Sequence, residues 1–274
     1  MPPPRASASS GRWRVSSVLV ALAAGLLLGL ALGTVGGGGA VLAVPVLIYL
    51  LGQSVHAATA ESLLVVVGAA GAGAAGHARH GTVCWRLAGA FAAAAVPGSV
   101  LGTVANRAVS AEPLLAAFAI LLLGVAVITW RRAGARAGAG DEACPPLRLG
   151  VVAGLGMSVG LLTGLFGVGG GFAVVPALAL GLRVPVRRAV ATSLVVVTAI
   201  SAVGFAEHLL AGSRVAWATT LPFAAAAILT ASGGAAIGAR LPRRALAQGF
   251  AVLLGAVAIY LVVSVVATGG PPHG

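Results

Sequence analysis

The chain contains two copies of one glycine-rich segment, which run over Gly33–Leu47 and Gly164–Leu178. Both copies pass from a run of glycines into a Val-Pro-x-Leu sequence. Laid over each other at an offset of 131 residues, residues 25–66 and 156–197 share 18 identities in 42 positions without a gap. A duplication whose best-kept element is a run of glycines inside apolar sequence predicts a membrane transporter made of two related halves.

Charged residues are absent from long stretches of this 274-residue chain. Apolar residues make up 59% of it and charged residues only 8%, with a mean hydropathy of +1.06, whereas soluble domains carry about a quarter charged residues. A helix needs about 20 apolar residues to cross the hydrocarbon of a bilayer. We therefore expect an all-α, polytopic transmembrane helix bundle in the plasma membrane, with about 8 full spans and 2 short segments.

The net charge of +12 comes from 17 basic residues that are all arginine. They cluster at the ends of the apolar runs, as topological anchors do, for example at Arg131, Arg132, Arg187 and Arg188. This placement argues against a nucleic-acid partner. The expected partners are a small anionic substrate and the lipid bilayer, and a homodimer is a candidate assembly.

Composition divides the chain into two repeats and a linker. We expect an N-terminal tail at 1–14, repeat 1 at 15–130, a linker at 131–148 rich in Gly, Pro and charge, repeat 2 at 149–268 and a C-terminal tail at 269–274. The long helices are predicted at 15–34, 58–76, 85–105 and 113–130 in repeat 1, and at 149–165, 189–207, 216–239 and 246–267 in repeat 2.

Each repeat also holds a short apolar piece, 41–51 or 172–182, which follows the glycines. Eleven helical residues rise about 16 Å, roughly half the hydrocarbon thickness, so the piece either re-enters the bilayer or completes a broken span. Five crossings per repeat place 12 arginines on one side and 5 on the other, and four crossings place 10 against 7. The positive-inside rule thus favours five, with inverted repeats and an outside N-terminus, although that puts the arginines of the tail on the wrong side.

The glycine runs are the first candidates for a substrate site. Consecutive glycines interrupt a helix and expose peptide groups that lipid cannot satisfy, so they survive only against protein or a water-filled cavity. A helix that begins there turns its free amides toward the break and favours an anion. The alternative is a tight turn at the membrane surface. The candidate substrate-binding residues of these segments are Gly36, Gly37, Gly38, Gly39, Pro45, Gly167, Gly169, Gly170, Gly171 and Pro176.

Other glycines recur every four residues, and for these we expect a structural role. A smooth stripe on one helix face lets a neighbouring backbone approach closely. The stripes are Gly25, Gly29 and Gly33 in repeat 1, and Gly156, Gly160 and Gly164 in repeat 2.

No cofactor or metal is expected. The glycine runs lack the preceding strand and the acidic residue of a dinucleotide site. The only two cysteines, Cys84 and Cys144, have no paired spacing and no surrounding metal ligands, so they indicate nothing about the redox compartment.

The segment Gly164–Leu178, the following Ala191-Thr192-Ser193-Leu194 and their counterparts in repeat 1 resemble the sulfite exporter TauE/SafE family of bacterial membrane proteins. The resemblance extends over about residues 18 to 267. It implies movement of anions, particularly sulfite and organosulfonates such as sulfoacetate, across the cytoplasmic membrane. Repeat 1 departs from repeat 2 at Glu61, where repeat 2 has Thr192, which leaves open whether both repeats bind substrate equally.

Hydroxyl and ionisable side chains complete the candidate set. Ser62, Thr192 and Ser193 follow the short pieces and could donate to sulfonate oxygens, although membrane hydroxyls also bond back to their own helix. Ionisable residues in apolar helices mark proton or ion paths, or else cap helices and anchor them at the interface. For Glu61 the structural alternative is a cap on a helix that begins near Thr59. The proton-coupling candidates are Glu61, His77, Glu207 and His208.

The leading hypothesis is a secondary transporter, not an enzyme, that moves sulfite, an organosulfonate or a similar small anion. The anion is held by amides at the two glycine breaks and by hydroxyls, and is released when the halves rock. The alternatives are a sulfur-handling thiol carrier or enzyme that uses Cys84 or Cys144, or a metal held by His77 and His208. A further alternative is a non-transporting membrane partner of another complex.

Overall fold

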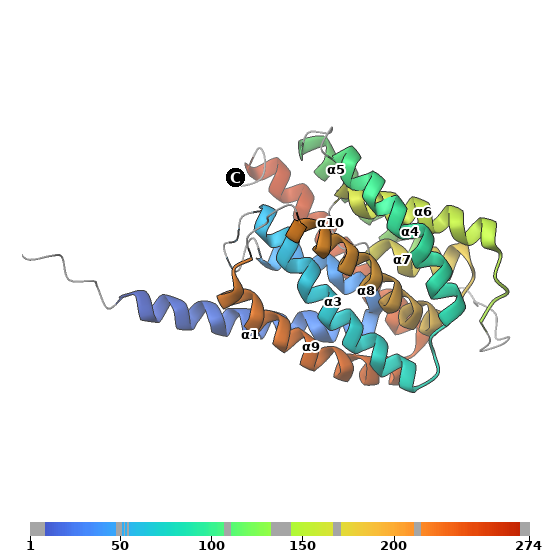
Figure 1. Cartoon of the computed structure of the whole chain (residues 1–274), viewed down its shortest axis with the longest axis horizontal. Helices are drawn as coiled ribbons and strands as arrows, with labels where there is room; N and C mark the ends of the chain where they lie inside the picture. The colour runs from blue at the N-terminus through green and yellow to red at the C-terminus, as the bar shows by residue number, and fades with distance from the viewer. Residues whose placement is uncertain are drawn as a thin grey trace, which may run out of the picture.

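The computed structural model describes residues 9–47, 51, 53, 55–106, 111–132, 144–166, 171–210 and 215–268, and this part of the chain is helical, without strands (Figure 1). The helices of repeat 1 are α1 (Ser9–Val35), η1 (Gly36–Leu42), α2 (Ala43–Pro45), α3 (Val55–Arg79), α4 (Trp85–Asn106) and α5 (Ala111–Arg132). The helices of repeat 2 are α6 (Leu149–Phe166), α7 (Gly171–Pro176), the π-helical turn η3 (Ala177–Gly181), α8 (Val186–Leu210), α9 (Trp217–Arg240) and α10 (Arg243–Thr268).

Every long helix predicted from the uncharged runs is present. Five helices of the described part are long and apolar enough to cross a membrane, namely α3, α4, α6, α8 and α9. Shorter apolar stretches lie within α1, α5 and α10, at Leu19–Val35, Ala117–Arg131 and Arg244–Tyr260. The protein is a polytopic helical bundle.

The short apolar piece of repeat 1, predicted at 41–51, begins earlier than expected. It was predicted to begin after the glycines, yet Gly36–Gly39 themselves form the first turn of the 3₁₀ helix η1. Glycine permits this because Gly36 has φ +81°, a left-handed conformation that reverses the chain directly after α1. The chain returns through α2 and reaches Gln53, whose side chain bonds to Thr219 near the start of α9.

The tightest helix pairs join one repeat to the other. Methyl groups built on the stripe glycines of α1 would overlap backbone atoms of α9, Gly29 against the carbonyl of Ala227 for example. The stripe of α6 packs on α4 in the same way, Gly160 against the carbonyl of Ala95. Contacts advance in the same direction along both members of each pair, so each pair is parallel. The stripes are therefore packing surfaces, as expected, but their partners lie in the opposite repeat.

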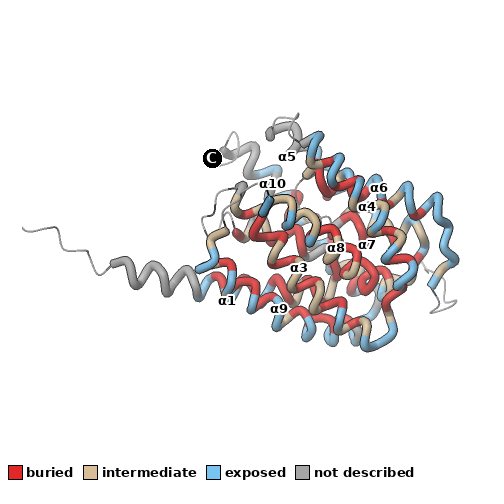
Figure 2. Tube along the Cα trace, viewed as in Figure 1, coloured by how far each residue is buried: buried red, intermediate tan, exposed pale blue. Residues whose placement is uncertain are grey.

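Helices α3 and α8 occupy the centre of the bundle and run antiparallel, since Gly73 lies against Leu194 and Gly204 against Leu63. Buried residues follow these central helices and the facing sides of the others, while the outer helix faces are exposed (Figure 2). Large apolar side chains lie on that outer surface, among them Leu27, Ile120, Leu229 and Ile259. A continuous apolar exterior is what a bilayer requires of the surface it covers.

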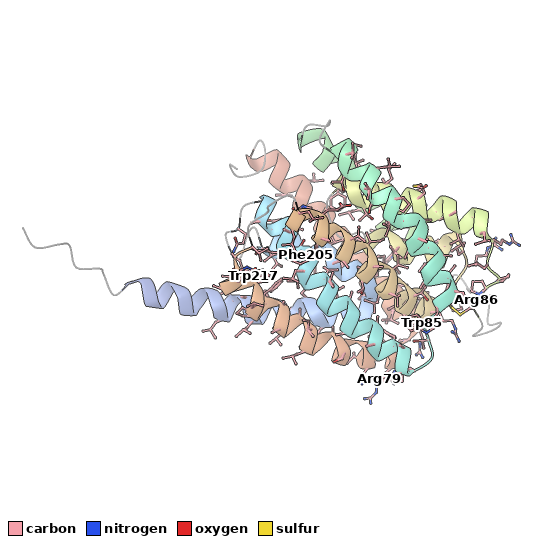
Figure 3. The ribbon with its side chains drawn as sticks, in the orientation of Figure 1. Arg79, Trp85, Arg86, Phe205 and Trp217 are labelled. Carbon is pink, nitrogen blue, oxygen red and sulfur yellow. A yellow bond between two sulfur atoms is a disulfide. The ribbon has the colours of Figure 1, made fainter. Side chains whose placement is uncertain are left out.

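Most of the described arginines lie at one end of the bundle. There the last turn of α3 meets the start of α8 and the end of α9, because Arg188 donates to the Gly81 carbonyl and Arg187 to the Leu241 carbonyl. Arg79 and Arg86 lie at this end in Figure 3, and Trp217 lies at the other. We call the end that carries Arg79, Arg86, Arg187 and Arg188 the arginine-rich end.

Candidate functional site

The first glycine break is Gly36–Gly39, and its first two residues, Gly36 and Gly37, are buried between helices of both repeats. The Gly37 amide donates a hydrogen bond to Ser193 Oγ at 3.3 Å, and Ser193 in turn donates to the Val190 carbonyl at 2.7 Å. A methyl group on Gly36 would run into Ser193 and Val190. Ser193 itself is fully buried. A hydroxyl from α8 thus satisfies an amide at the start of η1.

The second glycine break meets the first one at Gly171. A methyl group on Gly171 would collide with the carbonyl group of Gly37, so the two backbones are in direct contact. Both glycines are buried. Gly167, Gly169 and Gly170 lie outside the described residues. Gly36 and Gly37 of the first break are thus covered by protein on both sides of the contact.

The remaining candidates of the glycine segments take ordinary helical positions. Gly38 and Gly39 continue η1, Pro45 closes α2, and Pro176 is buried at the end of α7. Ser62 is buried and donates to the Thr59 carbonyl of its own helix at 2.8 Å.

A hollow at the arginine-rich end leads toward the first glycine break. It offers about 40 Å³ of space to water-sized molecules and opens to solvent. Val190 belongs to both places, because it lines the hollow and also contacts Gly36. His80 and Arg187 are exposed there, whereas His77 is buried. We call this the basic hollow, and the residues that line it are Thr34, His77, His80, Thr82, Arg187, Val190, Gly238 and Leu246.

The basic hollow is the part of the site that sequence reasoning missed. The sequence pattern predicts Arg187 as a topological anchor and gives no signal for Thr34, two residues before Gly36. A charge at the entrance of a helix gives the same sequence signal whether it faces lipid headgroups or a hollow. Only the packing of α1, α3, α8, α9 and α10 around one point distinguishes the two cases.

The four ionisable candidates are not gathered at one place. His77 Nε2 donates to the Gly33 carbonyl at 3.4 Å and is buried, so it is a packing contact of α1 and α3 rather than the interfacial anchor that was expected. His208 Nδ1 donates to the Gly204 carbonyl of its own helix at 2.9 Å. It lies at the opposite end of the bundle from His77, and Glu207 precedes it. The two histidines therefore cannot share a metal ion, and no cluster of three metal-ligating side chains occurs among the described residues.

Glu61 is fully buried in α3 and bonds to α9. Its Oε1 accepts a hydrogen bond from the Ala216 amide, directly before α9, at 2.7 Å. Thr192, which corresponds to Glu61 in repeat 2, accepts from the Cys84 amide directly before α4 at 3.1 Å. The expectation that Glu61 caps a helix starting near Thr59 is wrong, since α3 starts at Val55 and Glu61 caps a helix of the other repeat.

Cys84 and Cys144 form a disulfide bond, with a Cα–Cα distance of 5.8 Å across a sequence separation of 60. The sequence spacing of the two cysteines does not predict this pairing. The bond fastens the end of the linker to the start of α4, where Arg188 Nη1 approaches Cys144 Sγ at 3.5 Å. Because both cysteines of the chain are used in this bond, neither is a free thiol for a sulfur carrier.

Comparison with known proteins agrees with this architecture. The model of the family described as "Sulfite exporter TauE/SafE" matches residues 21–261. A "Probable membrane transporter protein" of Xylella fastidiosa (strain Temecula1 / ATCC 700964) is 32% identical over 257 residues, which cover 90% of this chain and 96% of the relative. "Probable membrane transporter protein YunE" of Bacillus subtilis (strain 168) is 29% identical over 254 residues, covering 84% of this chain and 93% of the relative. No solved structure matches the chain.

Proposed function

The chain belongs to the sulfite exporter TauE/SafE family and is a multi-pass membrane protein, and from this we propose that it is a secondary transporter for sulfite, an organosulfonate or a similar small anion. The relatives are described only as membrane transporters.

The observation that carries the proposal is the basic hollow above Gly36. Arg187 carries a fixed positive charge at its entrance, and a guanidinium group recognises oxyanions through its N–H groups. His77, His80, Thr34 and Thr82 also line the hollow, but in the structure His77 Nε2, His80 Nδ1 and both hydroxyl groups donate to backbone carbonyls, so an anion would have to take these donors from those carbonyls. An anion in the hollow is attracted before it loses its water, so the hollow serves as an entrance.

From the hollow the anion passes Val190 and reaches the first glycine break. In the structure the Gly37 amide is satisfied by Ser193 Oγ. A sulfite or sulfonate oxygen is a stronger acceptor than a hydroxyl, so it takes the Gly37 amide from Ser193 Oγ, and it takes the Ser193 hydroxyl proton from the Val190 carbonyl that accepts it in the structure. Ser193 thus protects the amide when no anion is present and helps to bind one when it arrives.

Repeat 2 supplies the second side of the same site in this proposal. By the sequence correspondence, Gly167, Gly169 and Gly170 take the places that repeat 1 gives to Gly36, Gly38 and Gly39. Ser62 corresponds to Ser193. The contact between Gly171 and Gly37 supports a common site.

Release needs moving parts, and the helix pairs suggest which ones they are. Rocking of repeat 1 against repeat 2 would separate α1 from α9 and α6 from α4, which pack backbone against backbone. The moving units are therefore two helix pairs and not the two repeats. One unit consists of α1 and α9 and the other of α4 and α6, so each unit contains one helix from each repeat. Each unit moves against the central helices α3 and α8.

The test is flux into vesicles that contain the purified protein, with labelled sulfite, sulfate and short organosulfonates offered separately. Saturable uptake of sulfite or an organosulfonate is expected. Arg187→Gln should weaken apparent affinity about tenfold, since a hydrogen bond to a charged group contributes about 1.5–3 kcal/mol. Arg183→Gln is the matched control, an exposed arginine of the same end that does not line the hollow. Absence of saturable uptake for every anion would overturn the proposal.

A further inference from the structure

Glu61 and Thr192 occupy corresponding positions in the two repeats and make corresponding contacts. Each one accepts the amide hydrogen of the residue directly before a helix of the other repeat, Glu61 from Ala216 and Thr192 from Cys84. Both side chains are fully buried. Each of the two residues thus caps a helix of the other repeat, and the same contact occurs in both copies of the duplicated sequence.

Thr192 shows that a neutral hydroxyl is sufficient for this cap. A carboxyl group in the same role is costly, because burial removes its water and its second oxygen needs a partner of its own. Glu61 Oε2 is buried and has no hydrogen-bond partner in the part of the chain that the structure describes. Capping therefore does not explain why repeat 1 has a carboxyl group here.

Among the described residues, the groups that face Glu61 are uncharged. They are the Ala216 amide and the Thr220 hydroxyl, both on the α9 side. On α8, which packs against α3, the titratable residues at this end are Glu207 and His208. No ion pair or hydrogen bond joins either of them to Glu61 among the described residues. Because no cation in the described part of the chain pairs with Glu61, binding a proton is the change that would neutralise its carboxyl group.

Protonation of Glu61 would act on a contact between helices. The ionised carboxylate accepts a charge-assisted bond at the N-terminus of α9, where the helix dipole favours a negative charge. A proton removes the charge and weakens that bond. Because α9 packs backbone to backbone on α1, loosening the bond between α3 and α9 frees the α1–α9 unit to move.

We propose that Glu61 is the single proton-binding site that couples anion movement to a proton gradient, with one proton bound per transport cycle. Thr192, the corresponding residue of repeat 2, has no carboxyl group that binds a proton, so only repeat 1 contributes to the proton coupling at this position. This inference rests on the proposed transport function and adds its energy source.

The experiment compares the wild-type protein with Glu61→Thr, which copies the cap of repeat 2, and with Glu61→Gln, which keeps the shape. Glu207→Gln is the matched control, a half-buried carboxyl on α8. Each protein is placed in vesicles, and labelled sulfite is followed in two assays: uptake driven by a pH gradient, and exchange at equal pH on both sides. Infrared spectroscopy records the titration of the carboxyl bands in the detergent-solubilised protein.

The wild-type protein and Glu207→Gln should take up more sulfite under the gradient, while both Glu61 variants lose that stimulation about tenfold or more and still exchange. Other carboxyl groups of the chain titrate in every variant, so the test is the difference from the wild-type spectrum: Glu61→Thr should lose one protonated-carboxyl component that Glu207→Gln keeps. Gradient-driven uptake that survives in Glu61→Thr, or a spectrum of it that keeps this component, would overturn the inference. If the wild-type protein transports sulfite equally well with and without the gradient, only the proton coupling is overturned. If the wild-type protein transports no sulfite at all, the proposed transport function is overturned.

Discussion

The backbone of Gly171 lies directly on the carbonyl group of Gly37, so the two glycine segments of the duplicated sequence touch inside the bundle. Only glycine allows this approach. We predict that Gly171→Ala separates the segments and lowers anion flux about tenfold or more, with a loss of about 1–3 kcal/mol in stability from overpacking.

Gly255→Ala is the control for that variant, because a methyl group there meets no atom within 4 Å. Flux per folded molecule is measured in vesicles, with the folded fraction taken from size-exclusion chromatography. Flux at the wild-type level in a folded Gly171→Ala protein would show that contact between the segments is not needed.

The parallel pair α4–α6 gives a second prediction, on stability. Gly160→Ala places a methyl group against the Ala95 carbonyl and should destabilise the protein by about 1–3 kcal/mol. Gly154→Ala lies on the same helix with nothing within 4 Å, and it should be neutral or stabilise by up to about 1 kcal/mol. Thermal unfolding in detergent separates the two cases, and equal melting temperatures would contradict the packing assigned to α6.

The disulfide between Cys84 and Cys144 is predicted to be structural. Replacement of both residues by serine should leave anion flux unchanged and lower thermal stability, since a cross-link that closes a loop of 60 residues stabilises by roughly 4 kcal/mol in the chain-entropy account. Mass spectrometry of the alkylated wild-type protein tests the bond itself. Loss of flux in a stable double variant would point instead to thiol chemistry.

The sidedness of the arginine-rich end gives a fourth prediction. The positive-inside rule places this end in the cytoplasm and the N-terminus outside, whereas the Cys84–Cys144 disulfide at the same end favours an oxidising compartment, so the sidedness also decides whether that bond persists in the cell. In the Cys84→Ser variant, Cys144 is the only thiol, and it is exposed. A membrane-impermeant maleimide added to intact cells should leave it unlabelled, while a permeant one labels it. Labelling of Cys144 by the impermeant maleimide would show that the arginine-rich end faces the outside of the cell.

Much of the fold followed from the sequence, because the features involved are local. Uncharged runs located the long helices, and glycines four residues apart located the smooth faces at Gly29 and Gly160. The partner of each face could not be predicted, since periodicity describes one helix and not the helix opposite. The sequence therefore suggested two separable halves, whereas α1 packs on α9 and α6 on α4.

The parts of the site formed by neighbouring residues in the sequence could be predicted. The parts formed by contacts between residues far apart in the sequence could not. The glycine segments and Ser193 stood out in the sequence, and they meet in the structure. The Glu61 bond to Ala216 spans 155 residues, and the pairing of Cys84 with Cys144 depends on where the linker ends. No spacing rule detects contacts of this kind.

The central claim is that an anion reaches the first glycine break beside Ser193 through the basic hollow. Its most direct test is a Ser193→Cys variant in a background with Cys84→Ser and Cys144→Ser. A small thiosulfonate reagent that carries a sulfonate group is applied, and the rate of modification is measured with and without a short organosulfonate. We predict modification that the organosulfonate slows, and that Arg187→Gln slows as well. A thiol that stays unmodified in a folded protein, or whose modification no anion slows, would contradict the account.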